Sequence, residues 1–163
     1  MRRILSIDPG YDRCGVAIIE KNVAGKLILM YSTCLTTDKK LAFSERLLSL
    51  KNELTQIVEK YIPNESAIEK LFFAKNTRTA LLVAESCGVI RVTLEELNLR
   101  PKEYTPSEIK LAVTGYGNAD KEAISFMTRK LLTISTMKKL DDELDAIAVG
   151  VTHAFTTHFE NLQ

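Results

Sequence analysis

The chain has 163 residues, a net charge of +1 at pH 7 and a hydrophobic fraction of 45%. This length and composition favour a single globular domain spanning residues 1–163 and leave little room for a second. The apolar stretch near the N-terminus is broken by Asp8 and Pro9, and no stretch approaches the roughly 20 apolar residues of a membrane span. We therefore expect a cytoplasmic protein that makes no contact with a membrane.

The cysteines are three in number, lie far apart in the sequence and form no C-x-x-C pair. This spacing indicates neither a zinc site nor a disulfide framework. Cys14, Cys34 and Cys87 are therefore predicted to be buried free thiols.

The first part of the chain has the pattern of three closely spaced strands. They are expected over Arg3–Asp8, Cys14–Glu20 and Lys26–Thr36, with turns at Pro-Gly-Tyr-Asp and at Ala-Gly between them. Such short connections favour an antiparallel meander.

Helices and strands alternate in the rest of the chain. Apolar residues at helical spacing predict a long amphipathic helix over Leu41–Ile62 and a second over Thr77–Leu97. Short strands are expected over Ser66–Glu69 and Arg100–Tyr104, and three further helices begin at "TPSEI", which has the residues of a capping box, at Asp120 and at "DDELD". This order predicts an α/β fold, with a central mixed five-stranded sheet covered by helices on both faces.

Acidic residues stand at the ends of two predicted strands and at the start of the last helix. Asp8 ends the first strand and Glu69 the fourth, so their carboxylates lie side by side if the two strands are neighbours. In "DDELD", Asp142 and Asp145 share a helical face, and so do Asp141 and Asp145. The helix dipole alone accounts for acids in a first turn, so the function of any one of these residues remains open.

The acids taken together predict a metal site. Four carboxylates within about 5 Å of one another would repel by roughly 3 kcal/mol per pair, so such a cluster must bind protons or cations. Ligands that are all oxygen favour Mg²⁺ or Mn²⁺, and two such ions support hydrolysis of a phosphodiester. Without four of the 21 acids, 22 Lys and Arg face 17 acids, a modest basic surplus that suits a polyanionic substrate.

Four segments of the sequence closely resemble the RuvC family of Holliday junction resolvases, which have a ribonuclease-H-like fold. They are "ILSIDPG" with "CGVAII", "AIEKLFFAKN" with "TALLVAESCGVI", "EYTPSEIKLAVTGYGNADK" and "DDELDAIAVGVTHA". The resemblance implies a homodimer that binds four-way DNA junctions in recombination and repair and nicks two strands of like polarity symmetrically. It also implies Mg²⁺ as cofactor, with Mn²⁺ as a substitute, and a junction-branch-migration motor complex as a candidate partner.

The resemblance also implies which acids form the catalytic and metal-binding site. Asp8 and Glu69 match the two strand acids of the family, and Asp145 matches its last acid. Asp142, three residues before Asp145, matches the remaining one, with Asp141 as an alternative. The four would hold two metal ions.

DNA contacts are implied for a loop and for two lysines. Phe72 matches an aromatic residue that packs on bases near the junction centre, although its neighbour Phe73 could take that place. The other residues expected to contact DNA are Lys75, Asn76, Arg78, Lys110 and Lys121. Lys121 is also a candidate for stabilising charge in the transition state, whereas His153 is interpreted as a packing residue.

Three other functions are compatible with parts of the sequence. Sugar kinases and heat-shock-type ATPases use a similar opening strand and turn, but they need a second lobe for which 163 residues leave no room. A junction-binding protein without chemistry would not need all four acids. A ribonuclease-H-like nuclease acting on RNA or on other branched nucleic acids remains an alternative.

Overall fold

The computed structural model describes residues 1–71, 77–132 and 141–160, apart from the side chains of residues 77–78 and 157–160. The strands are β1 (Arg2–Asp8), β2 (Arg13–Lys21), β3 (Leu27–Thr36), β4 (Glu65–Glu69) and β5 (Pro101–Tyr104). The helices are α1 (Phe43–Tyr61), α2 (Thr77–Glu96), α3 (Pro106–Thr114), α4 (Lys121–Leu131) and α5 (Asp141–Glu160). Each strand begins and ends within one residue of its predicted bounds.

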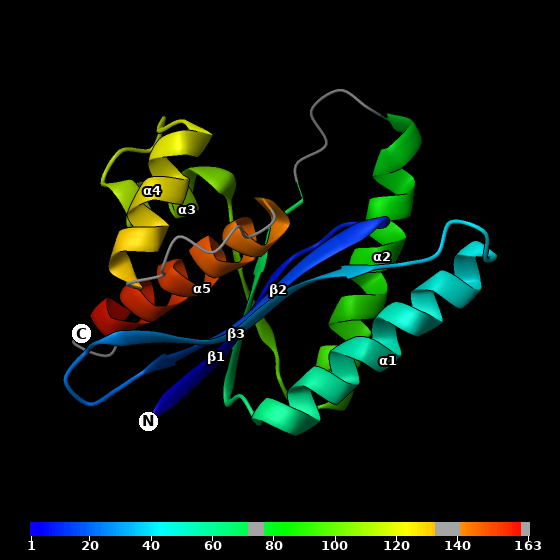
Figure 1. The fold of residues 1–163 in the computed structure, drawn as a ribbon, viewed down its shortest axis with the longest axis horizontal. Helices are drawn as coiled ribbons and strands as arrows, with labels where there is room; N and C mark the ends of the chain where they lie inside the picture. Colours follow the sequence, from blue (N-terminus) through cyan, green and yellow to red (C-terminus); the bar gives the residue numbers. More distant parts are fainter. Residues whose placement is uncertain (72–76, 133–140, 161–163) are drawn as a thin grey trace.

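The five strands form one mixed sheet in the order β3-β2-β1-β4-β5. The first three are antiparallel, as predicted, whereas β4 pairs in parallel with β1 and β5 in parallel with β4. Helices α1 and α2 cover one face, and α3, α4 and α5 cover the other (Figure 1). The predicted α/β architecture is confirmed. None of the described helices is long and apolar enough to cross a membrane.

The alternation of side chains along β1 and β4 decides where their terminal acids lie. In β1, Ile4 packs in the core beneath α5, whereas Leu5 and Ile7 pack in the core beneath α1 and α2. Side chains alternate between the faces of a strand, so Asp8 falls on the α5 face. The same alternation in β4 places Glu69 on that face.

Helix α5 lies unusually close to the sheet at two glycines. A Cβ atom on Gly150 would stand 2.6 Å from Ser6 Oγ and 2.6 Å from Ile19 Cδ1. A Cβ atom on Gly15, in β2, would overlap the backbone oxygen of Asp142. Gly15 therefore seats the first turn of α5, which carries the acids, directly on the sheet.

Replacing Gly15 with Ala should lift this first turn from β2. We expect the free energy of unfolding to fall by about 1–3 kcal/mol, because the added methyl group meets backbone that cannot rotate away. Thermal or urea denaturation measures the loss. Gly88→Ala is the matched control, since a Cβ atom there meets nothing within 4 Å and Ala favours a helix over Gly. Equal stability of Gly15→Ala and the wild type would contradict the close approach.

Helix α3 begins with the predicted capping box. Thr105 Oγ1 accepts a hydrogen bond from the backbone N–H of Glu108 at 3.3 Å, and the Glu108 carboxylate accepts one from the backbone N–H of Thr105 at 2.7 Å. This cap fixes the start of α3 directly after β5, which ends beside Glu69 in the sheet. Lys110, in the middle of α3, is thereby held on the same side of the molecule as the acids.

Candidate active site

Four acids from three elements meet at one end of the sheet. Ile7 lies opposite Ile68 in the parallel pairing of β1 and β4, so Asp8 and Glu69 follow next to each other at the strand ends. Neighbouring strands are about 4.8 Å apart. Asp142 and Asp145 come from the beginning of α5, which packs against β1 and β2 over this end of the sheet.

Asp8 is the electrostatic centre of the group. Burial raises the pKa of Asp8 from its ordinary 3.8 to about 8, and the charges of Glu69, Asp145 and Asp142 add to this shift. No side chain in the described ranges makes a hydrogen bond or an ion pair with Asp8. A carboxylate in such surroundings needs a proton or a cation.

The pKa values of Glu69 and Asp145 are raised by the same causes, burial and neighbouring negative charges. Burial raises the pKa of Glu69, and the charge of Asp145 raises it further. The pKa of Asp145 is also raised, chiefly by burial, although the ammonium group of Lys121 opposes the shift. The three groups therefore share an excess of negative charge.

Basic side chains form ion pairs with Asp142 and Asp145, the acids of α5 predicted to bind metal. Lys121 Nζ lies 3.2 Å from Asp145 Oδ2 and 3.5 Å from Asp141 Oδ2. Asp142 forms an ion pair with Arg13, the first residue of β2. The described ranges contain no group of three or more His, Cys, Asp or Glu residues arranged to bind a metal ion. The sequence predicted the acids and Lys121, but it gave no signal for Arg13.

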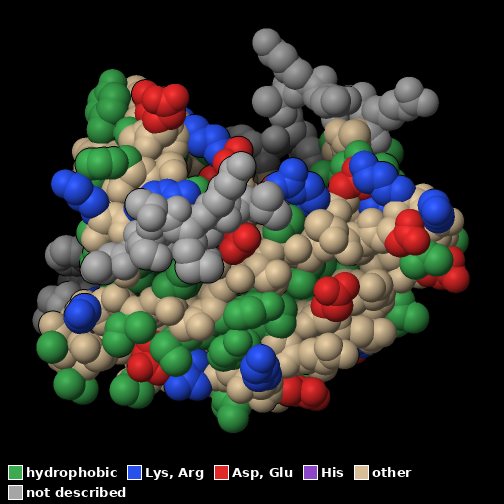
Figure 2. Space-filling view, viewed as in Figure 1, with side chains coloured by type: hydrophobic (Ala, Val, Ile, Leu, Met, Phe, Trp, Pro, Cys, Tyr) green, Lys and Arg blue, Asp and Glu red, His purple; other side chains and the backbone are tan. Residues whose placement is uncertain are grey.

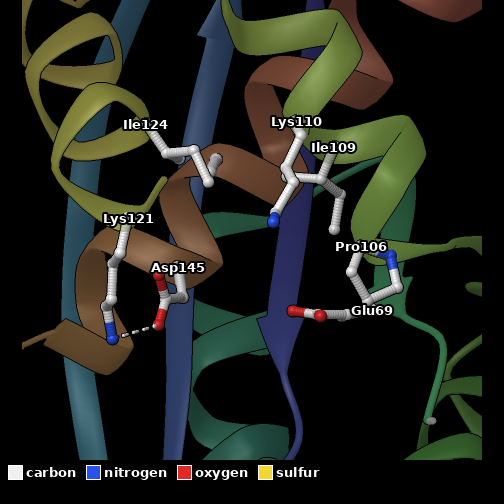
Figure 3. A pocket seen from close by; sticks show the side chains of 8 residues that line it. Glu69, Pro106, Ile109, Lys110, Lys121, Ile124 and Asp145 are labelled. Atoms are coloured by element: carbon white, nitrogen blue, oxygen red, sulfur yellow. Dashed lines mark ion pairs between the residues drawn. The ribbon is translucent and has the colours of Figure 1, made fainter. Parts of the chain in front are cut away.

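A cavity of about 220 Å³ opens beside these acids. Figure 3 shows the Glu69 carboxylate and the Lys110 ammonium group pointing into it, with the Lys121–Asp145 ion pair at its other side. Pro106, on α3, forms part of the remaining wall. Among the described residues Lys110 has no acidic partner, so its charge is available to an anion in the cavity.

Most of the residues predicted to contact DNA in and after "FFAKN" lie outside the part of the chain that the structure describes. Phe72, Phe73, Lys75 and Asn76 lie outside the described residues, and only the backbone of Arg78 is described, in the first turn of α2. Their roles stay predictions.

His153 is a packing residue, as predicted. It is 4% exposed, its Nε2 lies 2.9 Å from Glu65 Oε2, and its Nδ1 lies 2.9 Å from the Tyr104 hydroxyl. Glu65 begins β4, whereas Glu69 ends it. His153 therefore lies at the opposite end of the sheet from the acids.

The prediction for the cysteines is partly wrong. Cys14 and Cys87 are buried, but Cys34 is only partly buried. It lies on β3, which is the edge strand of the sheet, and its Sγ is 3.8 Å from Asp142 Oδ2.

The raised pKa of Asp8 predicts a pH-dependent effect of Asp8→Asn on stability. Between about pH 4 and about pH 8 the folded state keeps a proton that the unfolded state releases, so the wild type loses stability as the pH rises. In a buffer with a chelator, Asp8→Asn should be more stable than the wild type at about pH 8 and equally stable near pH 4. Urea denaturation at the two pH values measures the difference. A difference that does not change with pH would contradict the buried charge.

Comparison with known proteins gives a consistent result. The family model described as crossover junction endodeoxyribonuclease RuvC matches residues 4–153. The protein of that name from Brachyspira hyodysenteriae is 44% identical over 151 residues, 92% of this chain and 92% of that protein. The one from Roseiflexus sp. is 41% identical over 153 residues, 94% of this chain and 90% of that protein.

Solved structures agree with the sequences. Thermus thermophilus RuvC in complex with a Holliday junction substrate has a TM-score of 0.92 and 25% identity, with 98% of this chain and 97% of that chain covered. The yeast mitochondrial Holliday junction resolvase, at 13% identity and a TM-score of 0.70 over 99% of this chain and 85% of that chain, shares the fold. The predicted ribonuclease-H-like fold is thus confirmed. With a family model matched from residue 4 to residue 153 and relatives above 40% identity over nine-tenths of its length, this chain belongs to the RuvC family of crossover junction endodeoxyribonucleases.

Proposed function

We propose that this protein is an endonuclease that resolves Holliday junctions by paired, symmetric nicking of two strands of like polarity. The observation that carries the proposal is the placement of Asp8 and Glu69 side by side at the ends of β1 and β4, under the acidic first turn of α5. This placement brings four carboxylates from distant parts of the chain to one site, beside a cavity that two lysines line. Membership of the RuvC family supports the choice of a four-way DNA junction as substrate.

We propose Mg²⁺ as the cofactor, with Mn²⁺ as a substitute, on the chemistry of the donor atoms. Every proposed ligand is a carboxylate, the donor that hard divalent ions prefer. Asp8 and Glu69 from the sheet and Asp142 and Asp145 from α5 would hold two ions. When bound, such ions activate the attacking water and stabilise the leaving oxygen of a phosphodiester. The surplus negative charge that raises the pKa of Asp8 favours the binding of cations.

Asp142 rather than Asp141 is the proposed ligand. The Asp141 side chain is 75% exposed and lies beside Lys121, whereas the Asp142 side chain is 26% exposed. The charge of Asp142 is among those that raise the pKa of Asp8. Asp142 therefore belongs to the group of acids around Asp8.

The lysines of the cavity are proposed to bind the phosphate backbone. Lys110 reaches into the cavity from α3 and Lys121 from the start of α4 (Figure 3). Elsewhere on the face in Figure 2, basic side chains are interspersed with acidic ones and form no single basic field. Phosphate binding would therefore depend on these local lysines and on Lys75, Asn76 and Arg78, with Phe72 stacking on bases near the junction centre.

Symmetric nicking requires two active sites, and we propose a homodimer. Leu81 is 70% exposed and Val92 is 59% exposed on α2. Their spacing of eleven residues is close to three helical turns, so they lie on one face of the helix with Gly88 between them. A second copy would bury this apolar surface. Sedimentation equilibrium tests the proposal, and a monomer at micromolar concentrations would contradict it.

Incubation of the protein and Mg²⁺ with three labelled substrates tests the function. They are a synthetic four-way junction, a linear duplex and an RNA–DNA hybrid, each resolved on a denaturing gel. Paired nicks at symmetric positions of the junction alone are expected. Cleavage of the hybrid without cleavage of the junction would overturn the proposal in favour of a ribonuclease acting on RNA.

A further inference from the structure

Arg13 and Cys34 contact Asp142 from β2 and β3, on the side of β1 away from Glu69. Arg13 Nη2 and Cys34 Sγ both contact one oxygen of Asp142, Oδ2, and the sulfur lies 3.8 Å away. Arg13 begins β2 and Cys34 lies on β3, whereas Asp8 and Glu69 are on β1 and β4. Because β1 lies between β2 and β4 in the sheet, Arg13 draws the carboxylate away from Glu69.

The backbone of Asp142 cannot follow its side chain. Its backbone oxygen lies directly over Gly15, where even a Cβ atom would overlap it. Whether the carboxylate faces Arg13 or the other acids is therefore decided by rotation of the side chain. The Arg13 side chain is 49% exposed and carries a permanent positive charge.

We propose that Arg13 is a positioning residue that competes with a divalent cation for Asp142. The inference rests on the proposed function, in which Asp142 is a metal ligand. A cation entering beside Asp8 must exchange the Arg13–Asp142 ion pair for its own contact with Asp142. Arg13 thus lowers the affinity of the site for metal ions.

The test measures Mn²⁺ binding to the protein without DNA, by the electron paramagnetic resonance signal of free Mn²⁺ or by calorimetry. Arg13→Gln should bind Mn²⁺ about two- to fivefold more tightly than the wild type, the range that the loss of a partly exposed ion pair allows. Arg100→Gln is the matched control. Arg100 also pairs with an acid, Glu95 at 2.9 Å, but it lies before β5, at the opposite end of that strand from Glu69, and its loss should leave binding unchanged.

A double-mutant cycle separates competition from a general effect of charge. In an Asp142→Asn background the competition is absent, so Arg13→Gln should no longer change the affinity for Mn²⁺. The same gain in both backgrounds would show that charge alone acts and would overturn the inference. Equal or weaker binding by Arg13→Gln in the wild-type background would overturn it as well.

A second variant keeps the test decisive, and its outcomes distinguish the metal site from the role of Arg13. Should Arg13→Gln lose its fold by circular dichroism, Arg13→Met, which keeps the packing of the aliphatic stem, replaces it with the same expected gain. If neither the wild type nor the Arg13 variants bind Mn²⁺, both the proposed metal site and the inference about Arg13 are wrong. If the wild type and the Arg13 variants bind Mn²⁺ with equal affinity, the metal site stands and only the inference about Arg13 is wrong.

Discussion

Asp8→Asn is expected to lower the rate of Mg²⁺-dependent junction cleavage by at least about a hundredfold while leaving junction binding largely intact. The amide cannot supply the negative oxygen that a divalent cation needs, and it relieves the charge excess that favours the cation. The change is nearly isosteric, and no described side chain makes a hydrogen bond with Asp8, so the fold has no polar contact to lose there. Labelled junctions resolved on denaturing gels give the cleavage rate, and mobility shift in a chelating buffer gives binding.

Asp38→Asn is the matched control for this experiment. Asp38 is exposed, and its carboxylate accepts a hydrogen bond from the backbone N–H of Lys40 at 2.9 Å in the loop after β3. Its removal takes away the same charge and should leave cleavage unchanged. If Asp8→Asn cleaves the junction at the rate of the wild type, Asp8 is not a metal ligand.

Lys121→Ala is expected to slow cleavage by roughly tenfold to a hundredfold. Lys121 lies in the first turn of α4 and lines the cavity, with its Nζ 3.2 Å from Asp145 Oδ2. Although partial burial opposes it, the charges of Asp145 and Asp141 raise the pKa of Lys121, so the ammonium group stays charged. Its loss removes a positive charge beside a reacting phosphate and frees Asp145. Single-turnover cleavage of a saturating junction measures the effect.

Binding at several salt concentrations separates the two roles of Lys121. A lysine that contacts a phosphate adds about one unit to the slope of log affinity against log salt concentration, and Lys121→Ala should lose it. Lys130→Ala is the control on the same helix, because Lys130 is exposed and packs over Phe126, 4.9 Å from the ring centroid. If Lys121→Ala changes neither the cleavage rate nor the salt slope, Lys121 is a solvated surface residue.

The placement of the two strand acids was largely predictable. Asp8 and Glu69 each end a short apolar strand, and the end of the first is marked by a local signal, the Pro-Gly turn after Asp8. Alternation of side chains along a strand then fixes the face on which each acid lies. What remained conditional was whether β1 and β4 are neighbours, because strand pairing is a contact between segments about 60 residues apart.

The side chains that contact the acids, Arg13 and Cys34, could not be predicted from local sequence signals. Arg13 follows the opening turn as one of several charged residues, and nothing in its neighbourhood indicates a partner that lies 129 residues further along the chain. Cys34 resembled a buried thiol because β3 has an apolar pattern, but β3 is the edge strand and leaves Cys34 partly exposed. The choice between Asp141 and Asp142 likewise depended on family resemblance, since both share a helical face with Asp145.

By itself, the sequence determined the order and bounds of the strands and the acids that end them, because hydrophobic periodicity and turn residues act over a few neighbouring positions. Only the tertiary structure decided which strands pair, how closely α5 approaches β2 at Gly15, and which basic side chain faces each acid. These are distances between segments remote in the chain, set by packing and by the balance of charge in the folded molecule. The Arg13–Asp142 pair belongs entirely to this second kind.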